Sequence, residues 1–410
     1  MPPAMHCTLF KTLTVCQFIL TDQIIMVENM QPKYIQTVDE LDTIVGLTKK
    51  ERNDMEKVCE TFPFRVNDYY LSLVDWKNDR DPLKKIVIPD PRELKGGGSL
   101  DPSSEKDYTK LPGVQHKYSQ TGLLLLSDVC GGICRFCFRK RLFVTKERET
   151  VKEVCPGLEY IRTHREITNV LLTGGDPFSL ETSRLEPILK ELREIKHVNI
   201  IRIGSKMPAY NPYRFLNDPA LMDILSRYST PEQRIYVMAH YNHPREMTQP
   251  SMEAVAQLQQ SGVVVVNQTP LLNEVNSDPG TFTDLFRKLS FAGISPYYVF
   301  QCRPSLGNRF FQIPVERSYD IIQQAWQRCS GLAKRARFVM SHATGKIEVV
   351  GKTQTHVFMR YHQAAEPAAI GKTMVYRSNP TARWFDDYLH QPTPIRGFLS
   401  MKMPAMQWLF

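Results

Sequence analysis

Three cysteines, Cys130, Cys134 and Cys137, are spaced C-x3-C-x2-C directly after the apolar run Leu123–Leu126. Thiolates are the usual ligands of iron–sulfur clusters, and three of them at this spacing suit a 4Fe–4S cluster. The fourth iron then has no protein ligand and is open to a small molecule. The spacing therefore predicts a cluster that takes part in chemistry.

Structural zinc is the alternative interpretation of this motif. A structural zinc site closes with four ligands and usually pairs two short spacings, whereas the other downstream cysteines here are isolated. Basic residues around the motif are expected to lower the thiol pKa and to offset the negative charge of a cluster. These residues are Arg135, Arg139, Lys140 and Arg141. We therefore favour the iron–sulfur cluster.

From about residue 120 onward, short apolar segments alternate with longer amphipathic ones. The elements that they form must hold the cysteine motif in place. Such a pattern is typical of a parallel sheet covered on both faces. Six apolar runs predict an α/β fold with a partial (β/α)6 barrel, because a full barrel needs eight. The runs are Leu123–Leu126, Val170–Leu172, Ile200–Ile203, Ile235–Met238, Val263–Val266 and Tyr297–Phe300. Helices are expected between and after them, for example at Leu185–Ile195, Met252–Gln260 and Ser318–Arg328.

Polar residues follow nearly every one of these runs. In parallel α/β folds the carboxyl ends of the strands meet at one edge, where the functional site is built. We therefore expect these residues to surround one pocket, although Gly174-Gly175 alone also fits a tight strand-to-helix turn. The residues are Cys130, Gly174, Gly175, Asp176, Ser205, His240, Gln268 and Cys302.

Composition divides the remaining chain into further regions. Residues 1–31 are a poorly patterned extension, and residues 32–116 form a helical region and a Pro/Gly/Ser-rich connector. Helix starts are predicted at Thr37 and at Thr48, where Glu51 completes a capping box. Residues 117–312 are the barrel. Residues 313–410 are a C-terminal region with short strands at Gly345–Gly351 and Thr373–Arg377 and an apolar tail.

Bulk composition excludes several classes of protein. The 410 residues are 42% hydrophobic and 23% charged, as in a soluble globular protein. The net charge of +9 is spread along the chain, which does not favour nucleic-acid binding. Nine cysteines, an odd number, argue against a disulfide scaffold and fit a reducing cytoplasm. No run approaches the ~18 apolar residues of a membrane-spanning helix.

The motif Cys130-Gly-Gly-Ile-Cys-Arg-Phe-Cys-Phe-Arg-Lys-Arg141 resembles that of radical S-adenosylmethionine enzymes, and in particular the lysine 2,3-aminomutase family. The likeness runs in one order from about residue 32 to about residue 350. It includes Val170–Asp176, Ile201–Ser205, His240–Pro244, Asn267-Gln268 and Pro296–Cys302. In that family the open iron chelates S-adenosylmethionine, and one electron from the cluster releases a 5′-deoxyadenosyl radical that abstracts hydrogen. An electron donor such as flavodoxin or ferredoxin is implied.

The resemblance also implies residues that bind S-adenosylmethionine. Gly174 and Gly175 would let the backbone approach the methionine part closely, and Asp176 would accept from its ammonium group. Ser205, His240 and Gln268 are candidate ligands for the ribose, adenine or carboxylate.

Family members hold pyridoxal phosphate as a Schiff base on a lysine in a Gly-rich segment after the barrel. The matching position is Lys346, although only Gly345 remains of the several glycines of the family. The family's phosphate-binding segment matches at Lys117-Tyr118, whereas its second arginine corresponds to Thr121. Lys140 or Arg141 is a candidate substitute for that missing cation. A lysine forms a Schiff base only when its amine is neutral.

The family comparison also marks substrate positions. Arg139 matches the residue that binds the substrate α-carboxylate. Two acidic positions that receive the distal ammonium of lysine are replaced by Arg303 and Ser341. Because Arg303 would repel that ammonium, we expect a substrate other than lysine, such as glutamate or another anionic amino acid. The alternative is that Arg303 turns toward an internal carboxylate. The family's structural zinc site has no counterpart.

Three hypotheses follow. The first is a cytoplasmic, homo-oligomeric isomerase, a pyridoxal-phosphate-dependent 2,3-aminomutase that acts on a small amino acid. The second is a radical S-adenosylmethionine enzyme without pyridoxal phosphate that abstracts hydrogen from a peptide or an anionic metabolite. The third is a non-enzymatic iron–sulfur protein that binds a partner or nucleic acid through its basic face.

Overall fold

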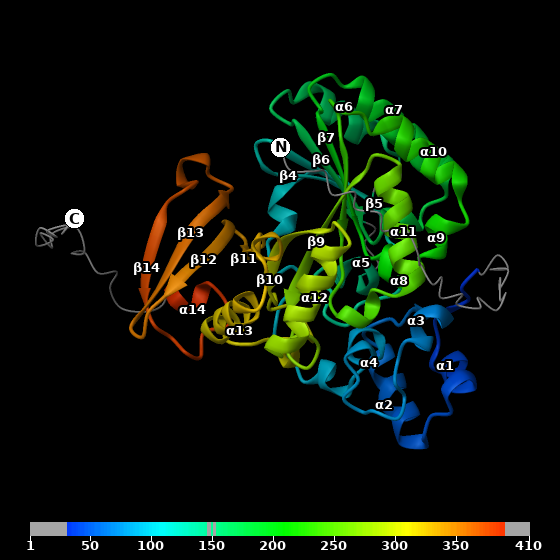
Figure 1. The fold of residues 1–410 in the computed structure, drawn as a ribbon, viewed down its shortest axis with the longest axis vertical. Coiled ribbons are helices and arrows are strands. Elements are labelled where there is room, and N and C mark those ends of the chain that lie inside the picture. The colour runs from blue at the N-terminus through cyan, green and yellow to red at the C-terminus, as the bar shows by residue number, and fades with distance from the viewer. Residues whose placement is uncertain (1–30, 146–148, 151–152, 390–410) are drawn as a thin grey trace, which may run out of the picture. The chain divides into compact units, whose positions relative to one another are not determined.

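The computed structural model describes residues 31–145, 149–150 and 153–389. Twelve strands form one sheet in the order β14-β13-β12-β11-β10-β9-β8-β7-β6-β5-β4-β3 (Figure 1). The central strands are β5 (Thr121–Ser127), β6 (Asn169–Gly174), β7 (Ile200–Ser205), β8 (Ile235–Ala239), β9 (Val264–Leu271) and β10 (Ser295–Gln301). Each contains most or all of a predicted apolar run, so the six predicted strands are confirmed.

Strands β5 to β10 are parallel, and helices follow them in the chain. Alternate residues such as Leu172 and Ile203 point to a helix-covered core, and the residues between them face inward. The sheet ends at β3 and β14 without closing, so the predicted partial (β/α)6 barrel is confirmed. The helices are α5 (Arg141–Val144), α6 (Cys155–Thr163), α7 (Thr182–Glu194), α8 (Met207–Tyr210), α9 (Tyr213–Leu216), α10 (Pro219–Tyr228), α11 (Gln249–Gln260), α12 (Pro279–Phe291) and α13 (Val315–Gln327).

The N-terminal region is helical, as predicted. Helix α1 (Val38–Val45) begins after Thr37 and α2 (Lys49–Cys59) after Thr48. At each cap the threonine accepts from the third backbone N–H of the helix, and a glutamate there bonds back, which completes a capping box. Helices α3 (Asp68–Ser72) and α4 (Pro82–Val87) follow, with a short pair of strands, β1 (Tyr34–Ile35) and β2 (Val66–Asn67). Their apolar side chains form a second core with Phe136 and Tyr210.

The Pro/Gly/Ser-rich connector passes along the C-terminal strands. Ser99 bridges to Ser305, and the Ser103 hydroxyl donates to the Ser341 carbonyl. The connector includes two short 3-10 helices, η1 (Pro91–Leu94) and η2 (Glu105–Tyr108), and leads into β3 (Thr109–Leu111) and β4 (Val114–Tyr118). The connector therefore crosses the sheet as a strap, which is one of the two roles that its composition predicts.

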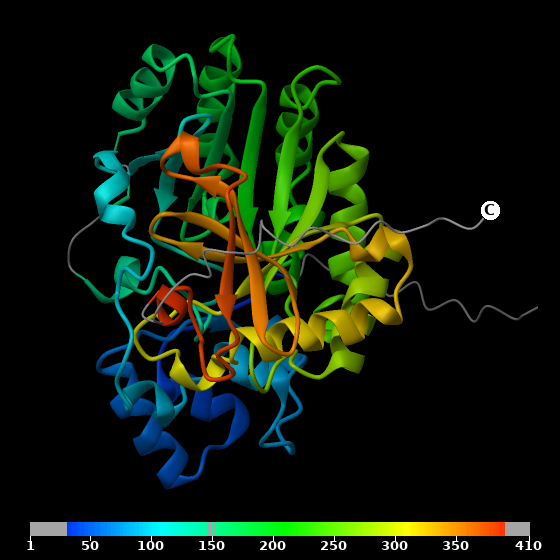
Figure 2. The same ribbon diagram turned by 90° about the vertical axis from the view of Figure 1, so that its left-hand side faces the viewer.

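The C-terminal region extends the sheet with four strands that pair antiparallel with one another, the first of which pairs parallel with β10 (Figure 2). It consists of β11 (Arg337–His342), β12 (Gly345–Lys352), β13 (His356–Ala364), β14 (Thr373–Arg377) and α14 (Asp386–Leu389). The predicted strands near Gly345 and Thr373 are confirmed, whereas β11 and β13 were not predicted. The N-terminal extension up to residue 30 and the whole apolar tail from Ile395 to Phe410 lie outside the described residues. Among the helices that the structure describes, none is long and apolar enough to cross a membrane.

Candidate active site

The inner face of the partial barrel surrounds a cavity of about 290 Å³. Its wall is built from alternate residues of the parallel strands, because every second side chain of a strand points inward. Apart from the candidate substitutes Lys140 and Arg141, the residues that the sequence predicts for the site line this cavity. These residues are Cys130, Cys134, Cys137, Gly174, Gly175, Asp176, Ser205, His240, Gln268, Lys117, Tyr118, Arg139, Arg303, Ser341 and Lys346.

The cysteine loop follows β5 and is fixed by the N-terminal region. The Ile133 N–H donates to the Arg65 carbonyl and the Arg135 N–H donates to the Ile86 carbonyl, each at 2.8 Å. The Arg65 Nε donates to the Cys130 carbonyl at 2.9 Å. The N-terminal region thus helps to determine where the three thiols lie.

Glu93 holds the same loop through two cations. Its carboxylate accepts from Arg135 at 2.7 and 2.9 Å and from the Lys140 ammonium at 3.1 Å, and all three side chains are buried. A buried charge without a partner is costly, so each of these residues depends on the other two.

We expect Glu93→Gln to lower the free energy of unfolding by about 3 kcal/mol or more, because Arg135 and Lys140 would then share no carboxylate. Urea denaturation measures this loss. The matched control is Glu159→Gln, which removes an exposed ion pair with Arg162 and is expected to cost less than about 1 kcal/mol. Equal losses in the two variants would contradict the role of Glu93.

The three cysteines are free and only partly exposed, and they line the cavity wall. Burial raises the pKa of Cys134 to about 12, and it also raises the pKa values of Cys130 and Cys137. The flanking cations Arg139, Lys140 and Arg141 do act to lower the pKa of Cys137, as expected, but desolvation outweighs them. Deprotonation would accompany metal binding.

The donor set suits a cluster better than a single metal ion. Within the described part of the chain, no three Cys, His, Asp or Glu side chains converge closely enough to ligate one ion. The three thiols nevertheless line one cavity. A 4Fe–4S cluster fits this arrangement, since its ligands bind separate irons.

Gly174 and Gly175 lie against the chain that leads into the cysteine loop. A Cβ at Gly174 would lie 2.4 Å from the Ser127 carbonyl oxygen, and one at Gly175 would lie 2.4 Å from the Val129 carbonyl oxygen. Gly174 also has φ +121°, which other residues rarely adopt. The two glycines are thus required for a close approach of backbone to backbone, and they still line the cavity.

Asp176 is buried and accepts four hydrogen bonds within the chain. Oδ1 accepts from the Phe178 N–H, and Oδ2 accepts from Ser205 Oγ and from the Lys206 and Met207 N–H groups. Burial nevertheless raises the pKa of Asp176 to about 6. This carboxylate thus ties β6 to the residues that follow β7.

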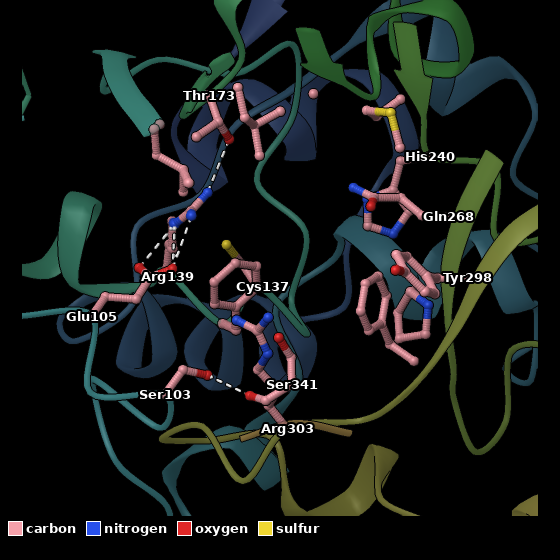
Figure 3. A pocket seen from close by; sticks show the side chains of 18 of the residues that line it. Ser103, Glu105, Cys137, Arg139, Thr173, His240, Gln268, Tyr298, Arg303 and Ser341 are labelled. Carbon is pink, nitrogen blue, oxygen red and sulfur yellow. Dashed lines mark hydrogen bonds and ion pairs between the residues drawn. The ribbon is translucent and has the colours of Figure 1, made fainter. Parts of the chain in front are cut away.

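His240 carries an unsatisfied nitrogen into the cavity. Its Nε2 is buried and has no hydrogen-bond partner among the residues that the structure describes. Burial, with help from the Lys206 ammonium, lowers the pKa of His240 to about 3, so the imidazole is neutral. The side chain lies near Gln268 in the cavity wall (Figure 3). A neutral ring with a free nitrogen fits a polar ligand such as S-adenosylmethionine.

Lys346 projects from β12 between two tyrosine rings. Its Nζ donates to Gln363 Oε1 at 3.0 Å and lies 4.7 Å from the Tyr118 ring centroid and 5.6 Å from that of Tyr298. Burial and three nearby cations lower the pKa of Lys346 to about 7. Much of the amine is therefore uncharged at neutral pH, as a nucleophilic lysine requires.

The three cations near Lys346 are Arg202, Arg303 and Lys117. Lys117 donates to the His342 carbonyl at 2.7 Å, and burial lowers its pKa to about 8. So many cations around one amine fit a bound anion such as a phosphate.

Lys140 and Arg141 do not supply the missing phosphate cation. Both lie outside the cavity wall: Lys140 pairs with Glu93, and Arg141 pairs with Glu105 and Glu149. The substitution proposed from the sequence was therefore wrong. Arg202, on the inner face of β7, lines the cavity in their place.

Arg139 is held between two internal partners on one side of the cavity (Figure 3). Its Nε and Nη2 donate to the Glu105 carboxylate at 2.8 to 3.2 Å, and its Nη1 donates to Thr173 Oγ1 at 2.9 Å. Glu105 also accepts from Arg141, and these cations hold the pKa of its carboxyl far below the usual range despite burial. The strap thus pairs the Glu105 carboxylate with Arg139, the residue that the sequence predicts to bind the substrate α-carboxylate.

Arg303 lies over the Phe138 ring, with its guanidinium carbon 3.6 Å from the ring centroid. Its Nη1 is buried and has no hydrogen-bond partner among the described residues. Burial lowers the pKa of Arg303 to about 10, although Glu105 partly opposes this effect. The structure therefore shows no internal carboxylate bonded to Arg303 within the described residues, unlike the alternative considered from the sequence.

Comparison with known proteins places these features in one family. The chain is 50% identical over 369 residues to a protein of Aquifex aeolicus that is provisionally named an L-lysine 2,3-aminomutase. The match covers 90% of this chain and 99% of the relative. It is 35% identical over 300 residues to the L-lysine 2,3-aminomutase of Clostridium subterminale, covering 72% of this chain and 71% of that one. The chain belongs to the lysine 2,3-aminomutase family of radical S-adenosylmethionine enzymes. Members of the family are isomerases that use a 4Fe–4S cluster, S-adenosylmethionine and pyridoxal phosphate.

The family also includes a relative with another substrate in its name. The glutamate 2,3-aminomutase of Clostridioides difficile is 33% identical over 302 residues, covering 73% of this chain and 70% of that one. Among solved structures, a radical SAM methyltransferase from Sphaerobacter thermophilus is 17% identical with a TM-score of 0.35, and covers 55% of this chain and 68% of that one. No family model matches the chain.

Two residues of this aminomutase-family site escaped the sequence interpretation. Arg202 is a charged residue inside the apolar run Ile200–Ile203, and such an interruption is a signal that a side chain faces a polar cavity. Glu105 lies in the connector, where nothing in the local sequence indicates that it contacts Arg139. Its role depends on how the strap crosses the sheet.

Proposed function

We propose that the protein is a pyridoxal-phosphate-dependent 2,3-aminomutase that acts on an amino acid with an anionic side chain, such as glutamate. The observation that carries this proposal is the presence of Lys346, with its lowered pKa, in the same cavity as the three cysteines. In this proposal residues 117–312 initiate the radical, and the C-terminal residues 313–410 supply the cofactor lysine.

The chain's own residues would divide the work as follows. Cys130, Cys134 and Cys137 hold the cluster, and the cavity wall around His240 and Gln268 binds S-adenosylmethionine. A low-potential donor of the flavodoxin or ferredoxin class supplies the electron. Together the bound groups supply a 5′-deoxyadenosyl radical and a conjugated ring that delocalises an unpaired electron.

Lys346 binds pyridoxal phosphate through its amine. Its neighbours Tyr118 and Tyr298 offer aromatic faces to the pyridine ring, and Lys117 and Arg202 offer cations to the phosphate. The bound cofactors and substrate would displace water from the cavity, which protects a reactive radical from side reactions.

Two arginines would fix the substrate. Arg139 binds the α-carboxylate, for which Glu105 must share or release the guanidinium. Arg303 binds the side-chain carboxylate through its unpartnered Nη1, because a buried guanidinium gains most from an anionic partner. The ammonium of a lysine side chain would instead meet a like charge at Arg303.

We expect the rate at which pyridoxal phosphate binds the apoenzyme to rise with pH, with a midpoint near pH 7. Only the neutral amine reacts, and the neutral fraction of Lys346 grows as pH rises through its pKa of about 7. The visible absorbance of the bound cofactor, followed after mixing at different pH values, measures the rate. Arg202→Met removes a neighbouring cation and should move the midpoint to higher pH. A wild-type midpoint above pH 9 would contradict the lowered pKa.

The function is tested by anaerobic reconstitution of the cluster, followed by incubation with S-adenosylmethionine, pyridoxal phosphate, a reductant and individual amino acids. Chromatography of the products should show a β-isomer from glutamate and none from lysine. Formation of 5′-deoxyadenosine without any β-isomer would support a pyridoxal-phosphate-independent enzyme instead. Absence of 5′-deoxyadenosine with a fully loaded cluster would exclude both.

A further inference from the structure

Tyr210 contacts one of the three cysteines directly. Its hydroxyl lies 2.9 Å from Cys134 Sγ, and the side chain is fully buried at the end of α8. A thiolate that binds iron carries no proton, so in the loaded protein the tyrosine is the donor of this hydrogen bond. The sequence patterns around the cysteine motif do not indicate this contact, because Tyr210 is distant in the chain.

The cysteine loop is shaped to admit the tyrosine ring. A Cβ at Gly132 would lie 3.2 Å from Cε2 and Cζ of Tyr210, and one at Gly131 would lie 2.5 Å from the sulfur of Met207. These two glycines directly follow Cys130 in the motif. Larger residues there would displace the helix that carries Tyr210, so the glycines allow the hydroxyl to reach the sulfur.

The N-terminal region holds the tyrosine in place. The Tyr70 ring packs edge-on against the Tyr210 ring at 4.7 Å, and Asn67 Nδ2 donates to the Tyr210 carbonyl at 2.8 Å. Tyr70 is fixed in turn, because its hydroxyl donates to Glu246 at 2.7 Å. The hydroxyl therefore has a fixed direction, which a tuning hydrogen bond requires.

A cation lies behind the ring. The Lys206 ammonium is 5.1 Å from the Tyr210 ring centroid, and it is held by Glu246 at 2.6 Å and by Asn242 at 2.7 Å. A cation on a phenol ring polarises the O–H bond and makes the hydroxyl a stronger donor.

We propose that Tyr210 donates a hydrogen bond to the Cys134 thiolate of the bound cluster and thereby raises the reduction potential of the cluster. On reduction the 4Fe–4S cluster accepts one electron, passing from the 2+ to the 1+ state, from a low-potential one-electron donor such as a reduced flavin or iron–sulfur protein. The added negative charge spreads onto the sulfur ligands, so a donor at Cys134 stabilises the reduced state more than the oxidised one. Tyr210 is a positioning residue in this sense, since it acts through the cysteine. The inference rests on the cluster that the proposed function places on the three cysteines, and not on the substrate or on pyridoxal phosphate.

The test is a redox titration of the reconstituted protein, with dithionite as reductant and the electron paramagnetic resonance signal of the reduced cluster as readout. We expect Tyr210→Phe to lower the midpoint potential at unchanged iron and sulfide content. The matched control is Tyr241→Phe, which also removes a buried hydroxyl, one that bonds to Ser251 rather than to a cysteine. This control should leave the potential unchanged.

A second variant keeps the proposal testable if Tyr210→Phe does not load a cluster. Site-specific 3-fluorotyrosine at position 210 retains the hydroxyl and makes it a stronger donor, and it should raise the midpoint potential. The proposal would be overturned if both variants load a cluster and both keep the wild-type potential. If Tyr210→Phe does not load, a wild-type potential in the fluorotyrosine protein would overturn it. Because the potential is measured without an amino acid, a failed aminomutase assay leaves this result interpretable, and a shifted potential would not establish the aminomutase.

Discussion

Replacement of Lys346 by alanine is expected to abolish formation of β-amino acid and to leave reductive cleavage of S-adenosylmethionine in place. The variant loses the amine that the proposal assigns to pyridoxal phosphate. The three cluster cysteines follow β5 and are unchanged, whereas Lys346 lies on β12. The two readouts are the β-isomer and 5′-deoxyadenosine, measured in the same reaction. The visible absorbance of bound pyridoxal phosphate should disappear as well.

The matched control for this prediction is Lys352→Ala. Lys352 lies on the same strand, β12, but its ammonium pairs with Asp320 at 2.7 Å and does not line the cavity. It should retain both activities. Full β-isomer production by Lys346→Ala would refute the assignment of the cofactor lysine, and loss of 5′-deoxyadenosine in that variant alone would show that Lys346 also supports radical initiation.

Reversal of the charge at Arg303 is expected to reverse the preference among substrates. Arg303→Asp should lower kcat/KM for glutamate by at least about 100-fold, since loss of a buried charge pair costs about 3 kcal/mol and a like charge adds repulsion. The new carboxylate would lie where a substrate ammonium is received, so lysine turnover should rise relative to glutamate turnover. Competition between the two amino acids in one reaction measures the ratio directly.

A neutral variant separates the loss of attraction from the gain of repulsion. Arg303→Met keeps much of the side-chain volume over Phe138 and should give an intermediate ratio. Arg335→Asp, at an exposed arginine outside the cavity, should leave the ratio unchanged. An unaltered glutamate preference in Arg303→Asp would show that Arg303 does not contact the substrate side chain.

The fold could be predicted from the sequence where the hydrophobic pattern was strong. The parallel strands are buried on both faces and read as continuous apolar runs, so all six were recognisable. Strand β13 was missed because its residues, from His356 to Ala364, mix buried apolar with polar and charged side chains. Strand β11 contains a short apolar run but lies close to the predicted β12, and only the sheet itself shows that the two form a hairpin.

The site was predictable in its membership but not in its internal contacts. The carboxyl ends of parallel strands must converge, which is why residues as distant as Cys130 and His240 could be placed in one pocket. Pairings within the pocket depend on side-chain directions and on the path of the strap. Two such contacts are the ion pair between Glu105 and Arg139 and the hydrogen bond between Tyr210 and Cys134. The spacing of these residues in the sequence does not predict either contact.

The hairpin that carries Lys346 has a consequence for the direction of its amine. His342 pairs with Gly345, so only Ala343 and Thr344 form the turn, and the next residue of β12 is the cavity-lining lysine. Successive side chains of a strand face opposite sides, so Ile347 lies in the core. Insertion of one residue with the two-residue turn kept would slip β12 by one position along β11, so that Lys346 would pair with Met340 on the core side and Gly345 would take its place at the cavity. The register set by one two-residue turn thus decides whether the amine of Lys346 faces the cavity or the core.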